Sequence, residues 1–310
     1  MQPLSGLRIN ILGGDARGSY AAQELALQGA SVKVLGLPIP KDMPNLQSCD
    51  HLEEALTGAD ALVIPLPGLD DQGFLYTMLG KPRRVPSNLF SSVNQKTPIF
   101  VVFAKSFLRK IAQQLNLHLI ELNNMDEFAI LNSIPSAEGV IQMAMESSPI
   151  TIHGSTSMVL GFGRTAMTLA RMLAALGSHT TVVARNPAAL ARAYEMGFHT
   201  LAFPSLPSHV GDYNFIFNTV PALVLNRDIL QRMNPETIII DLASAPGGVD
   251  YEAAKQLNIK AKLAPSLPGM VAPKSAGQIL ASVIARLLTN NAPGCFLKHQ
   301  GVLENAAEGR

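Results

Sequence analysis

The sequence has 310 residues, of which 47% are hydrophobic and 15% are charged, and its formal net charge is +1. A chain of this length has room for two α/β domains with buried cores, and its composition excludes a disordered protein. The small net charge provides no basic field for nucleic acid, so a small molecule is the expected partner.

Cysteine spacing and hydropathy narrow the class further. Cys49 and Cys295 are far apart and form no CxxC pair, which indicates reduced thiols rather than a disulfide framework or a metal site. No basic start leads into a long apolar run, and no run approaches the roughly 20 residues that a membrane-spanning helix needs. We therefore expect a cytoplasmic protein without a metal, a membrane anchor or a nucleic-acid partner.

The first half of the chain alternates short β-rich runs with helical patterns. The predicted strands are 8–12, 31–35, 61–64 and 99–103. A glycine turn, Gly13-Gly14-Asp15-Ala16-Arg17-Gly18, follows the first strand and opens a helix. Another strand ends at Pro65-Leu66-Pro67-Gly68, which would border the same cleft.

The turn at Gly13 departs from a dinucleotide-binding turn at one position. Asp15 occupies the place of the second glycine, where a side chain and a negative charge would oppose a pyrophosphate. We interpret the turn as a substrate site, in which Arg17 binds a carboxylate and Asp15 holds the arginine or handles a proton. A purely structural Asp–Arg pair explains the same residues equally well.

A linker helix is predicted between the halves. Pro135 and Ser136 precede an apolar-periodic stretch, with Ser136 as a candidate N-cap and Glu138 in the first turn. A second apolar helix, 276–288, could cross back to the first domain, as in two-domain dehydrogenases. The predicted division is an N-terminal domain 1–134, a linker helix 135–150, a nucleotide-binding domain 151–275, and a C-terminal helix and tail 276–310.

The second half repeats the rhythm of the first. Near-continuous apolar runs predict parallel strands that are buried on both faces, at 158–161, 181–184, 215–218 and 237–241. Both halves are therefore predicted to be Rossmann-like, doubly wound parallel-sheet domains of the α/β class, joined by helices. Glycines of the two halves align at an offset of 148 (161 − 13 and 177 − 29), which either a duplication or the common βαβ spacing explains.

The strongest motif is a dinucleotide-binding turn, G-x-G-x-x-A, between a strand and the predicted helix 167–176. In this pattern Gly161 permits the tight turn, Gly163 lets the main chain approach a pyrophosphate, and Ala166 allows close packing of the helix on the strand. The predicted cofactor-binding residues of this turn are Gly161, Phe162, Gly163, Arg164 and Thr165.

The end of the next strand indicates which dinucleotide binds. NAD-dependent enzymes usually place a carboxylate here, whereas this chain has Ala184-Arg185-Asn186. Arg185 would attract a 2′-phosphate, which favours NADP(H) over NAD(H), although an arginine can also stack on adenine and tolerate both.

Two further strand ends and one loop are expected to face the nicotinamide. Ligands bind at the carboxyl ends of strands in open α/β sheets. The residues concerned are Asn218, Thr219, Val220 and Pro221 after one strand, Asp241, Ala243 and Ser244 after the next, and Leu267 and Pro268 in a Pro/Gly-rich loop that runs to Lys274. Ordinary βα turns and turn punctuation are the alternative explanation.

Four motifs together resemble the A subunit of dipicolinate synthase from spore-forming bacteria. They are Gly13-Gly14-Asp15-Ala16-Arg17, Pro135-Ser136-Ala137-Glu138-Gly139, Gly161-Phe162-Gly163-Arg164-Thr165 and Leu267-Pro268-Gly269-Met270-Val271-Ala272-Pro273. The resemblance spans nearly the whole chain. The first and last motifs are fairly specific to that family, whereas many dehydrogenases share the cofactor turn. The chain departs mildly at Ser136 and Ala166, where the family usually has Thr and Gly.

The resemblance implies an NADP-dependent oxidoreductase that makes dipicolinate (pyridine-2,6-dicarboxylate) from a dihydrodipicolinate-type precursor during sporulation, in the mother cell. It also implies a homo-oligomer within a complex that contains a separate, flavoprotein-like B subunit. A dianionic substrate needs cationic or amide donors. The candidates for substrate binding and catalysis are Asp15, Arg17, Ser136 with the helix N-terminus beyond it, Glu138 and Lys274.

Two other functions remain open on the sequence. One is a different two-domain dehydrogenase of the 2-hydroxyacid or alanine type, although the catalytic His or Lys/His arrangement of those enzymes does not stand out here. The other is a non-catalytic nucleotide-binding subunit, which would bind a cofactor without turnover even with its partner present.

Overall fold

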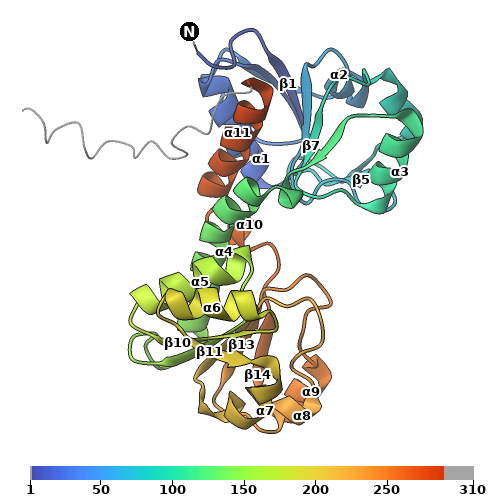
Figure 1. Ribbon diagram of the computed structural model, residues 1–310. Helices are drawn as coiled ribbons and strands as arrows, with labels where there is room; N and C mark the ends of the chain where they lie inside the picture. Colours follow the sequence, from blue (N-terminus) through green and yellow to red (C-terminus); the bar gives the residue numbers. More distant parts are fainter. Residues whose placement is uncertain (1, 290–310) are drawn as a thin grey trace, which may run out of the picture. The chain divides into compact units, whose positions relative to one another are not determined.

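The computed structural model describes residues 2–289 and divides into two compact units (Figure 1). The first unit takes the chain up to Asn124 together with the segment that begins at Lys274, and the second runs from Met125 to Pro273. Cys295 and the rest of the predicted tail lie outside the described residues.

A six-stranded parallel sheet forms the centre of the first unit, in the order β3-β2-β1-β4-β7-β8. Its strands are β1 (Arg8–Leu12), β2 (Ser31–Leu35), β3 (Leu46–Cys49), β4 (Ala61–Ile64), β7 (Ile99–Val101) and β8 (Leu119–Glu121). A short antiparallel hairpin, β5 (Phe74–Leu75) with β6 (Arg83–Arg84), lies outside this sheet.

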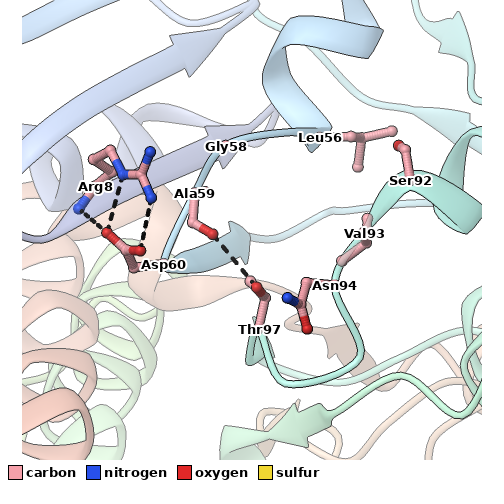
Figure 2. A pocket seen from close by; sticks show the side chains of 9 residues that line it. All are labelled: Arg8, Leu56, Gly58, Ala59, Asp60, Ser92, Val93, Asn94 and Thr97. Atoms are coloured by element: carbon pink, nitrogen blue, oxygen red, sulfur yellow. Dashed lines mark hydrogen bonds and ion pairs between the residues drawn. The ribbon is translucent and has the colours of Figure 1, made fainter.

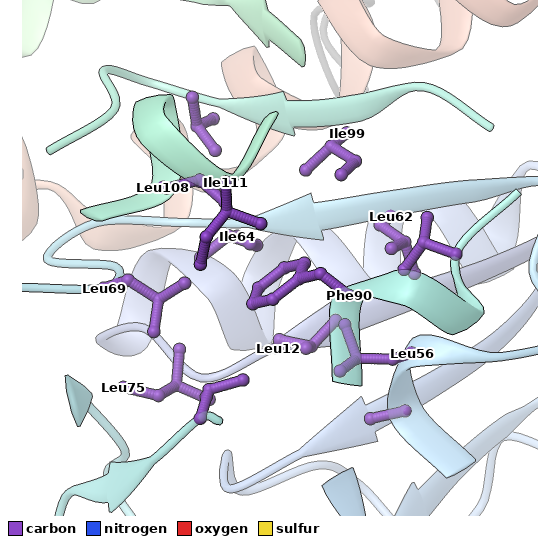
Figure 3. Packing of buried hydrophobic residues seen from close by; sticks show 14 of the residues in the cluster. Leu12, Leu56, Leu62, Ile64, Leu69, Leu75, Phe90, Ile99, Leu108 and Ile111 are labelled. Carbon is purple, nitrogen blue, oxygen red and sulfur yellow. The ribbon is translucent and has the colours of Figure 1, made fainter. Parts of the chain in front are cut away.

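Helices flank this sheet and bury its apolar strands. They are α1 (Ala16–Leu27), α2 (Leu52–Leu56), α3 (Ser106–Leu115) and α11 (Pro273–Thr289), with 3-10 turns η1 (Ser87–Ser92) and η2 (Leu122–Asn124). Figure 3 shows the fully buried ring of Phe90 from η1 between Leu12 and Ile64. In Figure 1 the red α11 runs beside the blue α1, and a Cβ at Gly277 would lie 2.6 Å from the Arg17 carbonyl oxygen.

The second unit repeats the same strand order, β11-β10-β9-β12-β13-β14, again in parallel. Its strands are β9 (Thr156–Leu160), β10 (His179–Ala184), β11 (His199–Ala202), β12 (Phe215–Asn218), β13 (Ile238–Asp241) and β14 (Lys260–Leu263). In both units the order is 3-2-1-4-5-6, that of doubly wound dinucleotide-binding domains. The predicted fold class is confirmed.

Along the chain, the helices of the second unit lie between these strands, except for α4, which precedes β9, and α10, which follows β14. They are α4 (Asp126–Ser147), α5 (Arg164–Ala175), α6 (Pro187–Glu195), α7 (Leu206–His209), α8 (Arg227–Leu230), α9 (Tyr251–Gln256) and α10 (Leu267–Val271), with 3-10 turns η3 (Phe203–Ser205) and η4 (Val210–Asp212). Helix α5 begins three residues before the predicted start at Met167.

The predicted start of the linker helix is wrong. Helix α4 begins at Asp126 and carries Pro135 inside it, so Ser136 is no N-cap and Glu138 lies in mid-helix. Proline removes the helical hydrogen bond to the Leu131 carbonyl, but Pro135 itself is buried, and the Ser136 hydroxyl donates within the helix to the carbonyl of Asn132 (2.8 Å). Tertiary packing thus outweighs a local helix-breaking signal.

The predicted loop at residues 267–274 is also wrong, because this stretch is helical. Leu267 and Pro268 open the short helix α10, and Pro273 opens α11. Proline at the first helical positions has no amide hydrogen to leave unsatisfied, so prolines here mark helix starts rather than a mobile loop.

Candidate functional site

The glycine turn of the second unit connects β9 to α5 at the carboxyl edge of the sheet. Gly161 has a φ of +94°, and a Cβ there would lie 2.4 Å from Thr219 Oγ1, so only glycine fits. Its amide donates to the Val183 carbonyl of the neighbouring strand (2.8 Å). The strand, turn and helix predicted around this motif are all present.

The main-chain amides beyond Gly161 point to a ligand. Within residues 2–289, none of the N–H groups of residues 162–166 has a hydrogen-bond partner. These amides include the first N–H groups of α5, where the helix dipole places partial positive charge. The arrangement suits an anion such as a pyrophosphate.

Gly163 provides an independent test of whether a dinucleotide fits. Its φ of −86° is open to any residue, and a Cβ there would meet no atom within 4 Å. Nothing in the described chain therefore requires glycine at this position. A phosphate that approaches the main chain closely does require it, so the turn fits a dinucleotide.

Arg164 and Thr165 lie in the first turn of α5. The Arg164 guanidinium pairs with Asp126 at the start of α4 (3.0 Å), and both side chains are largely exposed. Phe162 packs edge-on against Phe198, with 6.1 Å between ring centroids. The turn is thus anchored by one aromatic contact while its amides stay accessible.

The three residues after β10 differ in what they can offer a ligand. Ala184 is buried, and the Asn186 side chain caps α6 by accepting from the Ala188 amide (2.9 Å). Arg185 is exposed, and its side chain has no hydrogen bond or ion pair within residues 2–289. Of the three, Arg185 is the residue free to bind a charged group.

The residues after β12 lie against the glycine turn. Thr219 Oγ1 donates to the Leu160 carbonyl (2.8 Å), and Val220 Cγ2 lies 3.2 Å from a Cβ built at Gly161. Pro221 is exposed, whereas Asn218 is fully buried. Asn218 therefore supports this loop from the protein interior.

Asp241, at the end of β13, is fully buried and hydrogen-bonded within the unit. Ala243 is buried beside it, and Ser244 is exposed. Leu267 and Pro268 are buried in α10, where Leu267 packs near Gly139 of α4. The predicted set thus divides into residues that can face a ligand, such as Ser244, and residues that hold the structure together.

The corresponding turn of the first unit is closed by its own chain. Gly14 donates to the Tyr76 carbonyl and Asp15 donates to the Leu66 carbonyl, each at 2.9 Å. The Asp15 carboxylate caps α1 through the Arg17 amide (3.0 Å) and also accepts from Arg17 Nε (2.9 Å). The Arg17 side chain is only 8% exposed, and its Nη1 has no partner within the described chain.

The remaining catalytic candidates are distributed over both units. Glu138 is exposed on α4 and Ser136 is half-buried there, in the second unit. Lys274 is exposed at the start of α11, in the first unit. Among these five candidates, all within residues 2–289, the structure pairs only the side chains of Asp15 and Arg17.

A cavity of about 290 Å³ in the first unit is separate from the glycine turn of that unit (Figure 2). Arg8 opens β1 and Asp60 precedes β4, so the cavity is at the amino edge of the sheet, opposite the edge where such folds bind ligands. Asp60 already accepts from Arg8 Nε and Nη2 (3.2 and 3.0 Å). The ion pair with Arg8 lowers the pKa of Asp60 and compensates its negative charge.

Sequence reasoning missed three residues that shape the sites. Tyr251 donates to Asp241 (2.9 Å), Gly248 donates to the same carboxylate (2.7 Å), and Tyr76 closes the first turn with its carbonyl. Of these three contacts, only that of Gly248 has a local signal in the sequence, the glycine pair Gly247-Gly248. No group of three or more His, Cys, Asp or Glu in residues 2–289 could hold a metal, and no helix there is long and apolar enough to span a membrane.

Comparison with known proteins identifies the family. Residues 8–123 match the model of the N-terminal domain of the dipicolinate synthase A subunit, and residues 135–257 match that of the NAD-binding domain of D-isomer specific 2-hydroxyacid dehydrogenases. The dipicolinate synthase A subunit of Bacillus subtilis is 40% identical over 290 residues, which are 92% of this chain and 97% of that protein. This chain belongs to the family of dipicolinate synthase A subunits.

Solved structures agree with this assignment. The dipicolinate synthase A chain of Bacillus subtilis matches with a TM-score of 0.86 and 39% identity, over 93% of this chain and 97% of that one. The A subunit from Bacillus halodurans matches with a TM-score of 0.86 and 34% identity, over 92% and 98%. A transhydrogenase from Sinorhizobium meliloti, at 14% identity and a TM-score of 0.66 over 91% and 93%, shares the fold alone. The family member thus carries a dehydrogenase-type, NAD(P)-binding domain.

Proposed function

We propose that this chain is the A subunit of a dipicolinate synthase that oxidises a dihydrodipicolinate-type precursor to pyridine-2,6-dicarboxylate with NADP⁺. The observation that carries the proposal is the run of amides around Gly163, at residues 162–166, that have no partner in the described chain. The chain is also 40% identical to a dipicolinate synthase A subunit. The first finding supports dinucleotide binding, and the second supports the choice of reaction.

The cofactor would lie across the carboxyl edge of the second sheet. The turn from Gly161 to Thr165 would hold the pyrophosphate through its amides, and Arg185 would meet the 2′-phosphate of the adenosine. Thr219, Val220 and Ser244 would line the nicotinamide end. The support for NADP(H) over NAD(H) is the exposed Arg185, unpaired within residues 2–289, where a carboxylate would otherwise repel a phosphate.

The reaction balances as dihydrodipicolinate plus NADP⁺ giving dipicolinate, NADPH and one proton. Bound NADP⁺ would supply the hydride acceptor. The chain's own task is to hold the dianionic ring in a fixed orientation, and aromatisation of the ring provides the driving force.

Arg17 is our candidate for a substrate carboxylate. Asp15 holds its Nε and Nη2, which fixes the plane of the guanidinium and leaves Nη1 as a directed donor. Lys274, Ser136 and Glu138 remain candidates for further contacts or for the proton transfer. Arg17→Lys should raise the KM for the substrate at least about tenfold, because a fork of donors becomes a point charge, and leave NADPH affinity unchanged.

The proposal includes the setting of the enzyme. We infer that the partner is a separate, flavoprotein-like B subunit, that the present chain is homo-oligomeric within that complex, and that the complex acts in the mother cell during sporulation. The support is the family assignment, whose members are named as subunits.

The test is turnover by the purified chain with and without its B partner, after titration with NADPH and NADH. We expect tighter binding of NADPH and formation of dipicolinate with reduction of NADP⁺. Oxidation of a 2-hydroxyacid or alanine by the isolated chain would contradict the proposed substrate. Nucleotide binding without turnover in the complete complex would identify a non-catalytic subunit instead.

A further inference from the structure

Asp241 is the centre of a buried hydrogen-bond cluster in the second unit. Its Oδ1 accepts from Asn218 Nδ2 (2.8 Å) and the Ala243 amide (3.0 Å). Its Oδ2 accepts from the Gly248 amide (2.7 Å) and the Tyr251 hydroxyl (2.9 Å). All four acceptor positions of a carboxylate are thus used, which compensates the cost of burying the charge.

These four donors come from the chain on either side of two connections at the carboxyl edge of the sheet, since Asn218 ends β12 and Tyr251 begins α9. The Asn218 side chain also accepts from the Val220 amide and donates to the Val220 carbonyl in the loop after β12 (both 3.0 Å). Ala243 and Gly248 belong to the loop after β13. Asp241 therefore joins the two loops through a single side chain.

The two loops pack closely where they meet at Gly248, a junction that has no room for a larger residue. A Cβ at Gly248 would lie 2.4 Å from Asn218 Nδ2 and 2.7 Å from the carbonyl oxygens of Val220 and Ala222. The Gly248 carbonyl in turn accepts from the amides of Val224 and Leu225 (3.0 Å each). Contacts at both the Cα and the carbonyl of Gly248 therefore fix the distance between the two loops.

The junction also sets the position of the loop beside the glycine turn. Val220, which Asn218 fixes at both its amide and its carbonyl, packs near Gly161. Burial and the Asp241 carboxylate raise the pKa of Tyr251 well above its ordinary value, so the hydroxyl remains a donor at working pH.

We propose that Asp241 is a positioning residue that fixes the nicotinamide side of the cofactor site by holding the loops after β12 and β13 together. The inference rests on the proposed function. It differs from the interpretation of Asp241 as a cofactor ligand, because the buried carboxylate has no acceptor left for a bound molecule. The adenosine and pyrophosphate side, at the amides beyond Gly161 and at Arg185, has no hydrogen bond to this cluster within residues 2–289.

The test compares NADPH with 2′-phospho-ADP-ribose, which lacks only the nicotinamide. In Asp241→Asn, an NH2 group replaces one of the two carboxylate oxygens. Because NH2 cannot accept from the two donors on that side, the loops should separate. We expect NADPH affinity to fall about tenfold or more and 2′-phospho-ADP-ribose affinity to stay within about twofold. Tyr251→Phe removes one donor and leaves the other three, and should shift the same ratio by about threefold.

The outcomes separate the inference from the proposed function. Equal weakening of both ligands, or an unchanged ratio together with a lower melting temperature, would show a merely structural residue and overturn the inference. Equal affinity of the wild-type chain for both ligands would also overturn it. If the wild-type chain binds neither ligand, the proposed cofactor itself is wrong. If Asp241→Asn does not fold, Tyr251→Phe decides by the same ratio.

Discussion

Each unit has a glycine turn after its first strand, β1 or β9. The two turns differ in whether the chain itself provides hydrogen-bond acceptors for their main-chain amides. In the first unit, the amides of Gly14 and Asp15 donate to carbonyls of the chain itself. In the second, the equivalent amides of Phe162 and Gly163 have no partner within residues 2–289. The position that carries Asp15 as a helix cap in one turn carries an open glycine in the other.

Strand order alone does not make a nucleotide site. Both sheets have the same order, and helices α1 and α5 begin at the same place relative to their strands. The first turn is closed because the segment around Leu66 and Tyr76 folds over it and supplies carbonyl acceptors. We therefore expect one nucleotide per chain, bound by the second unit.

The largest expected effect is at Gly163. Gly163→Leu would place a side chain where the pyrophosphate approaches the main chain, and should weaken NADPH binding at least about 100-fold. The melting temperature should stay unchanged, since the position is open. Isothermal titration measures the first and thermal unfolding the second. Gly163→Ala is the graded control, with a smaller loss; full affinity in the leucine variant would refute the site.

Asp15→Gly tests the closed turn directly, because it restores the missing glycine. No second nucleotide should bind, since the Gly14 amide and that of residue 15 still donate to carbonyls. The free energy of unfolding should fall by about 2 kcal/mol, from the lost helix cap and the buried Arg17 left without its carboxylate. Titration that shows two nucleotides per chain would contradict the expected closure of the first turn.

Arg185 tests the adenosine end of the open turn. Arg185→Glu should weaken NADPH binding about tenfold or more by repulsion of the 2′-phosphate, and leave NADH binding the same or tighter. Arg192→Glu, at another exposed arginine of the same unit, is the matched control and should change neither affinity. An equal loss for both nucleotides would point to stacking on adenine instead.

The smallest effect concerns the amino edges of the sheets. Asp60 accepts from the Arg8 amide in the first unit, where Asn214 accepts from the Thr156 amide in the second (both 2.9 Å). Arg8 lowers the folded-state pKa of Asp60, so this contact contributes stability at neutral pH that is lost as the pH falls below about 4. Asp60→Asn should slightly flatten the acid side of the stability profile, as measured by denaturant unfolding. A steeper profile would contradict this.

Local patterns carried most of the fold. Apolar runs such as Phe215–Asn218 predicted the central strands, and the spacing of Gly161 and Gly163 predicted the turn, because both depend on neighbours in sequence. Edge strands such as β3 and β14 were missed, since they are short and partly exposed and neither is a near-continuous apolar run. The start of α4 was misplaced because packing around Pro135 is a tertiary effect.

The candidate site likewise has one part that local sequence predicts and another that depends on tertiary contacts. The open turn follows from spacing, but the burial of Asp241 and its bond to Tyr251 depend on how two loops meet in space. The closure of the first turn depends on Tyr76, more than 60 residues after Gly14. A single sequence contains no local signal for either contact. The roles of the predicted cofactor residues stay predictions until a nucleotide is titrated.

Helix α11 makes the first unit discontinuous along the chain. Its residues pack on α1 beside Arg17, although all of the second unit lies between them in sequence. During synthesis the ribosome must therefore complete the entire second unit before the last helix of the first can dock. The surface of α1 that α11 covers is exposed to solvent during that interval. A chain released too early would therefore be prone to aggregate.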